Sequence, residues 1–88
     1  MKYYVIEESC GTAMGGPDTR WEDGKIYSSV DKALKSFKKY PNEKMTIRNC
    51  TCEDYFSSNY GFIKEITIQD TKEWYRKWIY FIKEVEVE

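Results

Sequence analysis

Residues 28–40 carry the clearest apolar stripe at helical spacing in the chain. The stripe recurs at i, i+3, i+4 and i+7, at Val30, Ala33, Leu34 and Phe37. Ser28 stands three residues before Asp31, which is the spacing of a capping box, and Pro41 follows the pattern and ends it. The spacing therefore predicts one helix over residues 28–40, and this helix needs a packing partner to bury its stripe.

The runs on either side of this segment are typical of β-strands. They read KYYVIEE at residues 2–8, KMTIRNCTC at 44–52 and FIKEITIQ at 62–69, and bulky residues recur in them with period two. Residues 74–87 fit both a helix and a strand, because their large residues have helical spacing while the terminal EVEVE alternates strictly. Their content of Trp, Tyr, Ile, Phe and Val favours a strand, so we expect a C-terminal hairpin over residues 62–87.

The expected fold is α+β, with the element order β-α-β-β-β. An antiparallel sheet carries the helix on one face, and all 88 residues form a single domain. Residues 9–27 separate the first strand from the helix and hold most of the glycines of the chain. This segment predicts a long Gly-rich loop, and loops of this length in small domains are commonly functional.

Composition narrows the function. Lys and Arg number 14 against 15 Asp and Glu, so the net charge of −1 creates no field that would draw the chain to nucleic acid or membrane. The chain has no His, which removes the commonest general base, and we expect a protein that is not an enzyme. No apolar run reaches the roughly 18 residues of a membrane span, so we expect no membrane partner.

The cysteines predict a reducing compartment. Cys10, Cys50 and Cys52 are odd in number, and two of them are one residue apart, which is a poor framework for disulfides. No secretory signal stands at the N-terminus, so we expect a cytoplasmic protein with reduced thiols. A C-x-C pair without His also lacks the ligands of structural zinc, and we expect no metal and no cofactor.

The expected hairpin sets the candidate contact surface. If Asp70–Glu73 forms the turn, Gln69 pairs with Trp74 and fixes the register. The side chains that alternation then places on the face away from the helix are Trp74, Arg76, Trp78 and Tyr80. Because Trp, Tyr and Arg dominate protein interfaces, these residues are candidate partner contacts, with Trp21 as a fifth. In the alternative, the loop at residues 9–25 folds over this face and buries it as a second core.

Two other classes of site remain open. The segment after the first strand is Gly-rich, as loops that cradle phosphate are, and Trp21 is available to stack on a base. Its candidate ligand residues are Gly11, Gly15, Gly16 and Arg20. The outer face of the expected helix is basic, which beside an aromatic sheet suits nucleic acid. Its candidate residues are Lys32, Lys35 and Lys39.

The stretch GKIYSSVDKALKSF, residues 24–37, resembles short accessory proteins of bacterial phages and mobile elements. Several proteins of that anti-defence type bind and block host-defence complexes, and others sequester nucleotide signals. The resemblance implies a stoichiometric inhibitor of a protein complex, so a protein partner is the leading expectation. Sequestration of a small nucleotide and binding of nucleic acid stay open, as does a homodimer formed through the aromatic face or the sheet edge.

Overall fold

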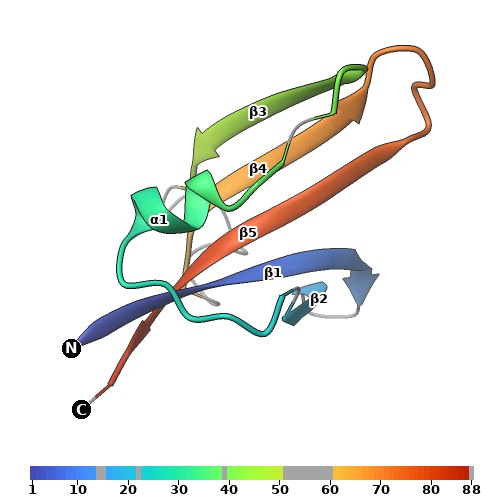
Figure 1. Cartoon of the computed structure of the whole chain (residues 1–88). Helices are drawn as coiled ribbons and strands as arrows, with labels where there is room; N and C mark the ends of the chain where they lie inside the picture. The colour runs from blue at the N-terminus through green and yellow to red at the C-terminus, as the bar shows by residue number, and fades with distance from the viewer. Residues whose placement is uncertain (14–15, 22, 39, 51–60, 88) are drawn as a thin grey trace.

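The described part of the chain forms one five-stranded antiparallel sheet, with a short helix against one face (Figure 1). The computed structural model describes residues 1–13, 16–21, 23–38, 40–50 and 61–87, with the backbone alone for 10–13 and 16–20. The elements are β1 (Lys2–Ala13), β2 (Gly16–Trp21), α1 (Val30–Lys35), β3 (Glu43–Asn49), β4 (Phe62–Asp70) and β5 (Lys77–Glu86). Their order across the sheet is β2-β1-β5-β4-β3, and each neighbouring pair is antiparallel.

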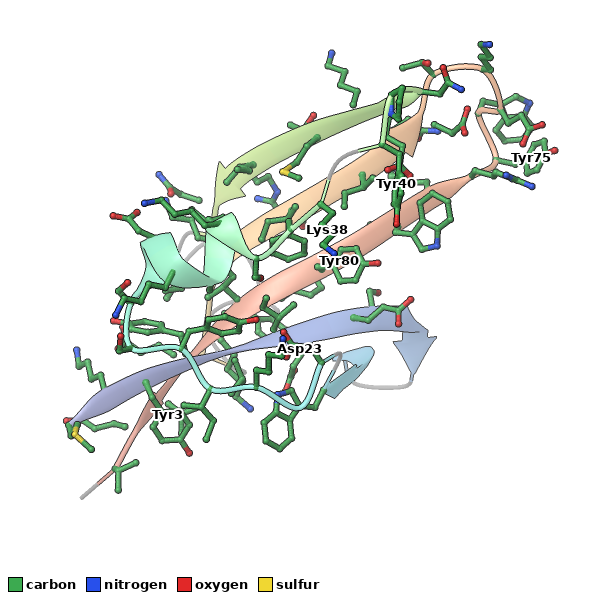
Figure 2. The ribbon with its side chains drawn as sticks, viewed as in Figure 1. Tyr3, Asp23, Lys38, Tyr40, Tyr75 and Tyr80 are labelled. Atoms are coloured by element: carbon green, nitrogen blue, oxygen red, sulfur yellow. The ribbon has the colours of Figure 1, made fainter. Side chains whose placement is uncertain are left out.

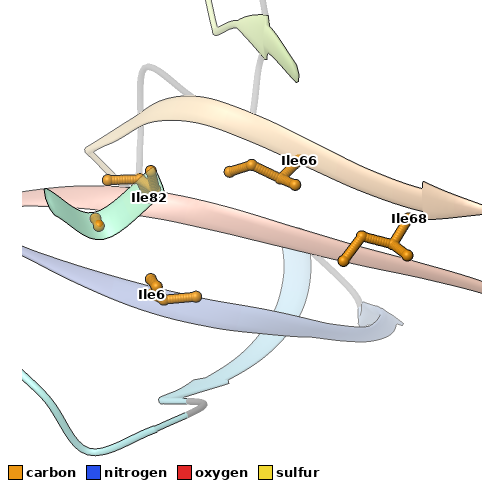
Figure 3. Packing of buried hydrophobic residues seen from close by; sticks show 5 residues of the cluster. Ile6, Ile66, Ile68 and Ile82 are labelled. Atoms are coloured by element: carbon orange, nitrogen blue, oxygen red, sulfur yellow. The ribbon is translucent and has the colours of Figure 1, made fainter. Parts of the chain in front are cut away.

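The core lies on the helix side, which is the face of the sheet that α1 covers. Ile6 of β1, Ile66 of β4 and Ile82 of β5 pack together there (Figure 3). Ala33 of α1 packs on this cluster from the helix side. None of these four residues exposes more than 2% of its surface. Because full burial of one isoleucine contributes about 1.5–3 kcal/mol, this small cluster is a main source of stability.

The opposite face of the sheet, which we call the far side, carries a second apolar pair. The rings of Phe62 and Phe81 stack with their centroids 4.5 Å apart, and both residues are buried. The β4–β5 ladder shifts register between Phe62 and Lys64, and Ile63 consequently packs against the helix-side core. The shift turns Phe62 to the far side, where regular alternation along β4 would not place it.

Helix α1 is shorter than the apolar stripe predicts, since it spans six residues. Ser29 caps its N-terminus, one residue later than expected, and the Ser29 hydroxyl accepts from the Lys32 amide at 3.2 Å. At the other end the Ser36 hydroxyl donates to the Ala33 carbonyl at 2.6 Å and closes the last turn. No helix in the described residues is long and apolar enough to cross a membrane.

The prediction of a loop over residues 9–27 is wrong for much of its length. β1 continues through Gly11, and β2 returns along it with Gly16 paired to Ala13. The physical reason is that β2 is an edge strand, where Pro17 is tolerated because the outer side of the ladder needs no donor. The ladder also shifts register around Gly11. The α+β class is as expected, but the element order is β-β-α-β-β-β.

β4 and β5 form the C-terminal hairpin, with a longer connection than the sequence predicts. Gln69 pairs with Lys77 and not with Trp74. The Asp70 amide donates to the Arg76 carbonyl at 2.9 Å and closes the connection at its base. The partner of Gln69 thus moves from position 74 to position 77, an odd number of residues, and an odd shift turns every β5 side chain to the other face.

Candidate binding surface

Beyond the C-terminal end of α1, the helix side of the sheet carries an open groove. The groove consists of two adjoining hollows of about 200 Å³ and about 240 Å³, which share Lys38, Ile68 and Tyr80. The first hollow is completed by Ile6, Asp23, Ser36 and Phe37, and the second by Tyr40, Glu43 and Trp78. We call this surface the aromatic groove. Figure 2 shows Lys38, Tyr40 and Tyr80 close together in front of the sheet.

The floor of the aromatic groove comes from β5. Tyr80 and Trp78 stand on the helix side because they pair with Ile66 and Ile68 of β4. The Tyr80 ring meets the Phe37 ring edge-on, with centroids 5.3 Å apart and planes at 62°, which is a favourable geometry for aromatic pairs. This contact leaves Tyr80 half-buried, whereas Trp78 keeps 37% of its surface exposed.

One wall of the groove is the turn that leads from α1 into β3. The Tyr40 amide donates to the Glu43 carboxylate at 3.1 Å, and the Glu43 amide donates to the Tyr40 carbonyl at 3.0 Å. These two hydrogen bonds fix the backbone beside the Tyr40 side chain, and 65% of the Tyr40 surface is exposed. A fixed backbone with an exposed ring suits a contact residue, because little conformational entropy remains to be lost on binding.

Charges of both signs line the groove. Lys38 is the cation that the two hollows share, and Asp23 and Glu43 supply one carboxylate to each. The Asp23 carboxylate also accepts from the Tyr27 hydroxyl at 2.5 Å and from the Lys25 amide at 3.0 Å. The hydrogen bond to Asp23 raises the pKa of Tyr27 above its ordinary value. The groove is therefore apolar in its rings and mixed in its charges.

The β4–β5 connection projects from one end of the sheet (Figure 1). It exposes further aromatic rings. Trp74 is 84% exposed and meets Tyr75 edge-on, with ring centroids 6.1 Å apart. The side-chain amide of Gln69 donates to the Trp74 and Arg76 carbonyls, each at 3.0 Å. These hydrogen bonds keep residues 74–76 in the connection, so that Gln69 pairs with Lys77.

Asp70 fixes the start of the same connection. Its carboxylate accepts from the amides of Lys72 and Glu73, each at 2.8 Å. These two backbone donors, that of Glu73 first, hold the pKa of Asp70 below its usual value. Arg76 closes the far end through an ion pair with Glu73 at 2.8 Å. Local hydrogen bonds therefore fix the backbone on which Trp74 is displayed.

The expectation that the C-terminal contact candidates share the face away from the helix is wrong. Trp78 and Tyr80 lie on the helix side, in the aromatic groove. Trp74 and Arg76 precede β5 and belong to the connection. The physical cause is the odd shift in the pairing of Gln69, which the turn chemistry of the connection sets.

Trp21, the fifth contact candidate, lies on the far side of the sheet. It pairs with Glu7, which pairs in turn with the far-side residue Phe81. Its indole donates to the Lys25 carbonyl at 3.2 Å, and 51% of its surface is exposed. It lines a hollow of about 220 Å³ with Tyr3, Val5, Glu7, Ile26, Lys83 and Val85. Because β2 extends the sheet beside β1, Gly16–Trp21 adds a strand instead of a second layer over β5, whereas Asp23 lines a hollow with Tyr80.

The candidates for phosphate binding are spread over two paired strands. Gly11 lies in β1, while Gly16 and Arg20 lie in β2, where Arg20 pairs with Glu8. Gly15 lies outside the described residues. A phosphate cradle needs successive amides that converge on one point, whereas the amides of a paired strand alternate in direction. Among the described residues, strand pairing takes the place of the loop on which that interpretation depended.

Two of the three lysines proposed for nucleic acid, Lys32 and Lys35, lie on α1 and do not line the aromatic groove. The Lys32 ammonium donates to the Ser28 hydroxyl at 3.0 Å, and Lys35 is exposed in the last turn. Lys39 lies outside the described residues. Lys38, which the sequence reasoning did not select, is the lysine that lines the groove.

Sequence reasoning also missed Tyr40 and Glu43 as site residues. The available signal was Pro41, which ends the helical pattern and sends the preceding aromatic residue into a turn beside the sheet. Within the described ranges, no three His, Cys, Asp or Glu side chains gather as a set of metal ligands. The groove combines aromatic rings, the aliphatic side chains of Ile6 and Ile68, and single charges, which are the components of a protein-binding surface.

Comparison with known proteins adds no relative. No family model, curated protein or solved structure matches this chain. The function is therefore inferred from the groove and its residues.

Proposed function

We propose that this chain is a non-enzymatic binding protein that holds a segment of a partner protein in the aromatic groove. The observation that carries the proposal is the exposure of Trp78 and Tyr40 around Lys38, on a backbone fixed by its own hydrogen bonds. Aromatic residues bury much area for little loss of entropy, and they are enriched among the residues that dominate binding energy.

The dimensions of the groove favour a protein segment over a nucleotide. Each hollow alone measures about 200 to 240 Å³, below the roughly 300–1,000 Å³ typical of small-molecule sites, and the two open side by side on the surface instead of forming one enclosed cavity. Single apolar side chains of a partner suit two small adjoining hollows better than one larger ligand does. Lys38 between the hollows complements a carboxylate beside those side chains.

The charges of the groove also favour a protein over nucleic acid. Asp23 and Glu43 line the same two hollows as Lys38, so the surface offers no row of cations to a phosphate backbone. A protein interface is typically mixed in charge around an apolar centre. A partner segment with an apolar side chain next to an acidic one meets both requirements.

A stoichiometric inhibitor is the mode of action that we propose for this binding. The support for it is the resemblance of residues 24–37 to short accessory proteins of phages and mobile elements. Blocking a surface of a protein complex requires no catalytic group, only an interface whose affinity and geometry exclude the natural partner.

Two tryptophan variants test the site. Trp78→Ala removes the exposed ring of the groove, and Trp21→Ala removes a comparably exposed ring from the far side. We expect tagged wild type and Trp21→Ala to retain the same protein from a nuclease-treated bacterial lysate at high salt. Trp78→Ala should lose it, with a fall in affinity of more than about 2 kcal/mol in titration of the purified partner.

The reverse pattern, in which Trp21→Ala alone loses the partner, would move the site to the far side and contradict the proposal. Loss of all binding after nuclease or salt would indicate a nucleic acid, because phosphate contacts weaken steeply with ionic strength. Retention of the partner by both variants would also contradict the assignment of the groove.

A further inference from the structure

β3 forms one edge of the described sheet, with β4 as its neighbour (Figure 1). Hydrogen bonds at the two ends of the ladder show which residues face inward. The Cys50 amide donates to the Ile63 carbonyl at 2.9 Å, and the Thr71 amide donates to the Asn42 carbonyl at 2.8 Å. The register between them is continuous, so the even-numbered residues of β3 bond to β4. The odd-numbered residues of β3 therefore direct their backbone amides and carbonyls away from β4, in the plane of the sheet and toward its open edge.

The outward-facing backbone of β3 forms a run of open donors and acceptors. The first outward amide, that of Glu43, already donates to the Tyr40 carbonyl at 3.0 Å. Among the described residues, the outward groups of Met45, Ile47 and Asn49 have no backbone partner. Open groups at regular spacing along a sheet edge are a template for a further strand.

Within the described residues, β3 lacks two of the features that commonly protect an edge. It contains no proline and no register shift, and Ile47, at the middle of the open run, exposes 46% of its surface. Arg48 carries a charge, but its guanidinium lies 2.8 Å from the Glu65 carboxylate of β4. Lys44 stands before the open run begins.

We propose that two copies of this chain pair through β3 in antiparallel orientation, centred on Ile47. In this register Ile47 faces Ile47 of the second copy, and Met45 faces Asn49 of the second copy, so the whole open run gains partners. Centring on Met45 would oppose Ile47 to Glu43, whose amide is already engaged. Centring on Asn49 would carry the pairing past the end of β3.

Side-chain chemistry suits a second copy as the occupant of this edge. On the helix side, the exposed Ile47 side chains of the two copies cover each other. On the far side, Thr46 faces Arg48 of the second copy, so no charge stands directly opposite a like charge. A two-fold axis through Ile47, perpendicular to the sheet, keeps both α1 helices on one side. The dimer therefore presents two aromatic grooves on one surface, although its formation does not depend on what the grooves bind.

Sedimentation of the full chain over a concentration series tests the proposal. Wild type is expected to move from monomer to dimer as concentration rises. Ile47→Lys sets like charges opposite each other at the axis and should raise the dimer Kd by about tenfold or more, and Ile47→Glu should do the same. An equimolar mixture of the two variants should recover the dimer that each alone has lost, because Lys and Glu attract across the axis.

Circular dichroism and Tm establish that the variants fold, which the exposure of Ile47 leads us to expect. If either variant unfolds, hydrogen exchange of the wild-type backbone amides shows whether β3 pairs in the dimer. The amides of Met45, Ile47 and Asn49 must then be protected at dimer concentrations and exchange faster on dilution. A wild-type chain that stays monomeric throughout the series overturns the proposal and leaves the edge to a strand of another protein. A dimer that both variants retain, or a mixture that stays monomeric, overturns the register centred on Ile47.

Discussion

Within strand β5, the run from Trp78 to Ile82 has a sealed end at Ile82 and an open end at Trp78 on the same face of the sheet. Ile82 has 0% exposure and packs in the core with Ala33. Two residues earlier, Tyr80 is half-buried against Phe37. Another two residues earlier, Trp78 exposes 37% of its surface over the aromatic groove. Steps of two residues keep a side chain on one face, so burial changes along the strand while the face stays the same.

The length of α1 accounts for the difference between the two ends. The six residues of α1 span about 9 Å, whereas the ten residues of β5 span roughly 33 Å. A helix of this length seals the core at one end and leaves aromatic residues uncovered at the other. The core and the proposed binding surface therefore use different positions of one strand, and substitutions along β5 should separate stability from binding.

The largest expected effect lies at the sealed end. Ile82→Ala leaves a cavity in the core and should lower the free energy of unfolding by about 2–5 kcal/mol, a large part of the stability of a small domain. Ile26→Ala is the matched control, because it removes the same atoms from a site that is 60% exposed. Urea denaturation measures both variants. Equal losses of stability would contradict the assignment of the core to the Ile82 end.

Tyr80 stands between the two ends and should show both effects. Tyr80→Ala removes a half-buried ring that packs on Phe37 and should lower the free energy of unfolding by roughly 1–3 kcal/mol. It should also weaken partner binding, since Tyr80 lines both hollows of the groove. Tyr80→Phe keeps the ring contact and serves as the control. A loss of binding without any loss of stability would place Tyr80 at the open end.

At the open end, Trp78→Ala should separate binding from stability. Because Trp78 lies at the surface and its removal leaves no enclosed cavity, Trp78→Ala should lower the free energy of unfolding by less than Ile82→Ala does. Urea denaturation of the free protein, set beside titration of the partner, measures the separation. Trp21→Ala is the control for the loss of an exposed indole. A loss of stability as large as that of Ile82→Ala would show that Trp78 belongs to the core.

The sequence predicted the kinds of element better than their pairing. The stripe of Val30, Ala33, Leu34 and Phe37 indicated the helix, and alternation indicated the strands around it. These signals are local, because each residue type favours one backbone geometry. The end of α1 at Lys35 was not predicted, since there the Phe37 ring turns toward Tyr80 on a distant strand.

Two aromatic residues of the candidate site could be predicted from the sequence, but the face on which they lie could not. Trp78 and Tyr80 were identified as contact candidates from their residue types alone. Their face depends on whether Gln69 pairs with position 74 or 77, and side-chain hydrogen bonds inside the connection decide this. Tyr40 joins them only through the tertiary fold. β2 was missed because Gly and Pro, which usually signal loops, are tolerated on an edge strand.

The smallest expected effect concerns Asp70, which fixes the connection at the open end without touching the core. Its pKa is lowered from an ordinary value of 3.8 by the amides of Glu73 and Lys72. A lowered pKa in the folded state means that the carboxylate stabilises the fold at pH values above 3.8 and loses this contribution as pH falls through the folded pKa. Asp70→Ala should therefore lower Tm slightly at neutral pH. Asp70→Asn should lower Tm less, because one acceptor oxygen remains. Both differences from wild type should vanish in acid. Thermal unfolding of the three proteins between neutral pH and pH 2 measures this; a difference that persists below the folded pKa would show that Asp70 acts through its shape and not its charge.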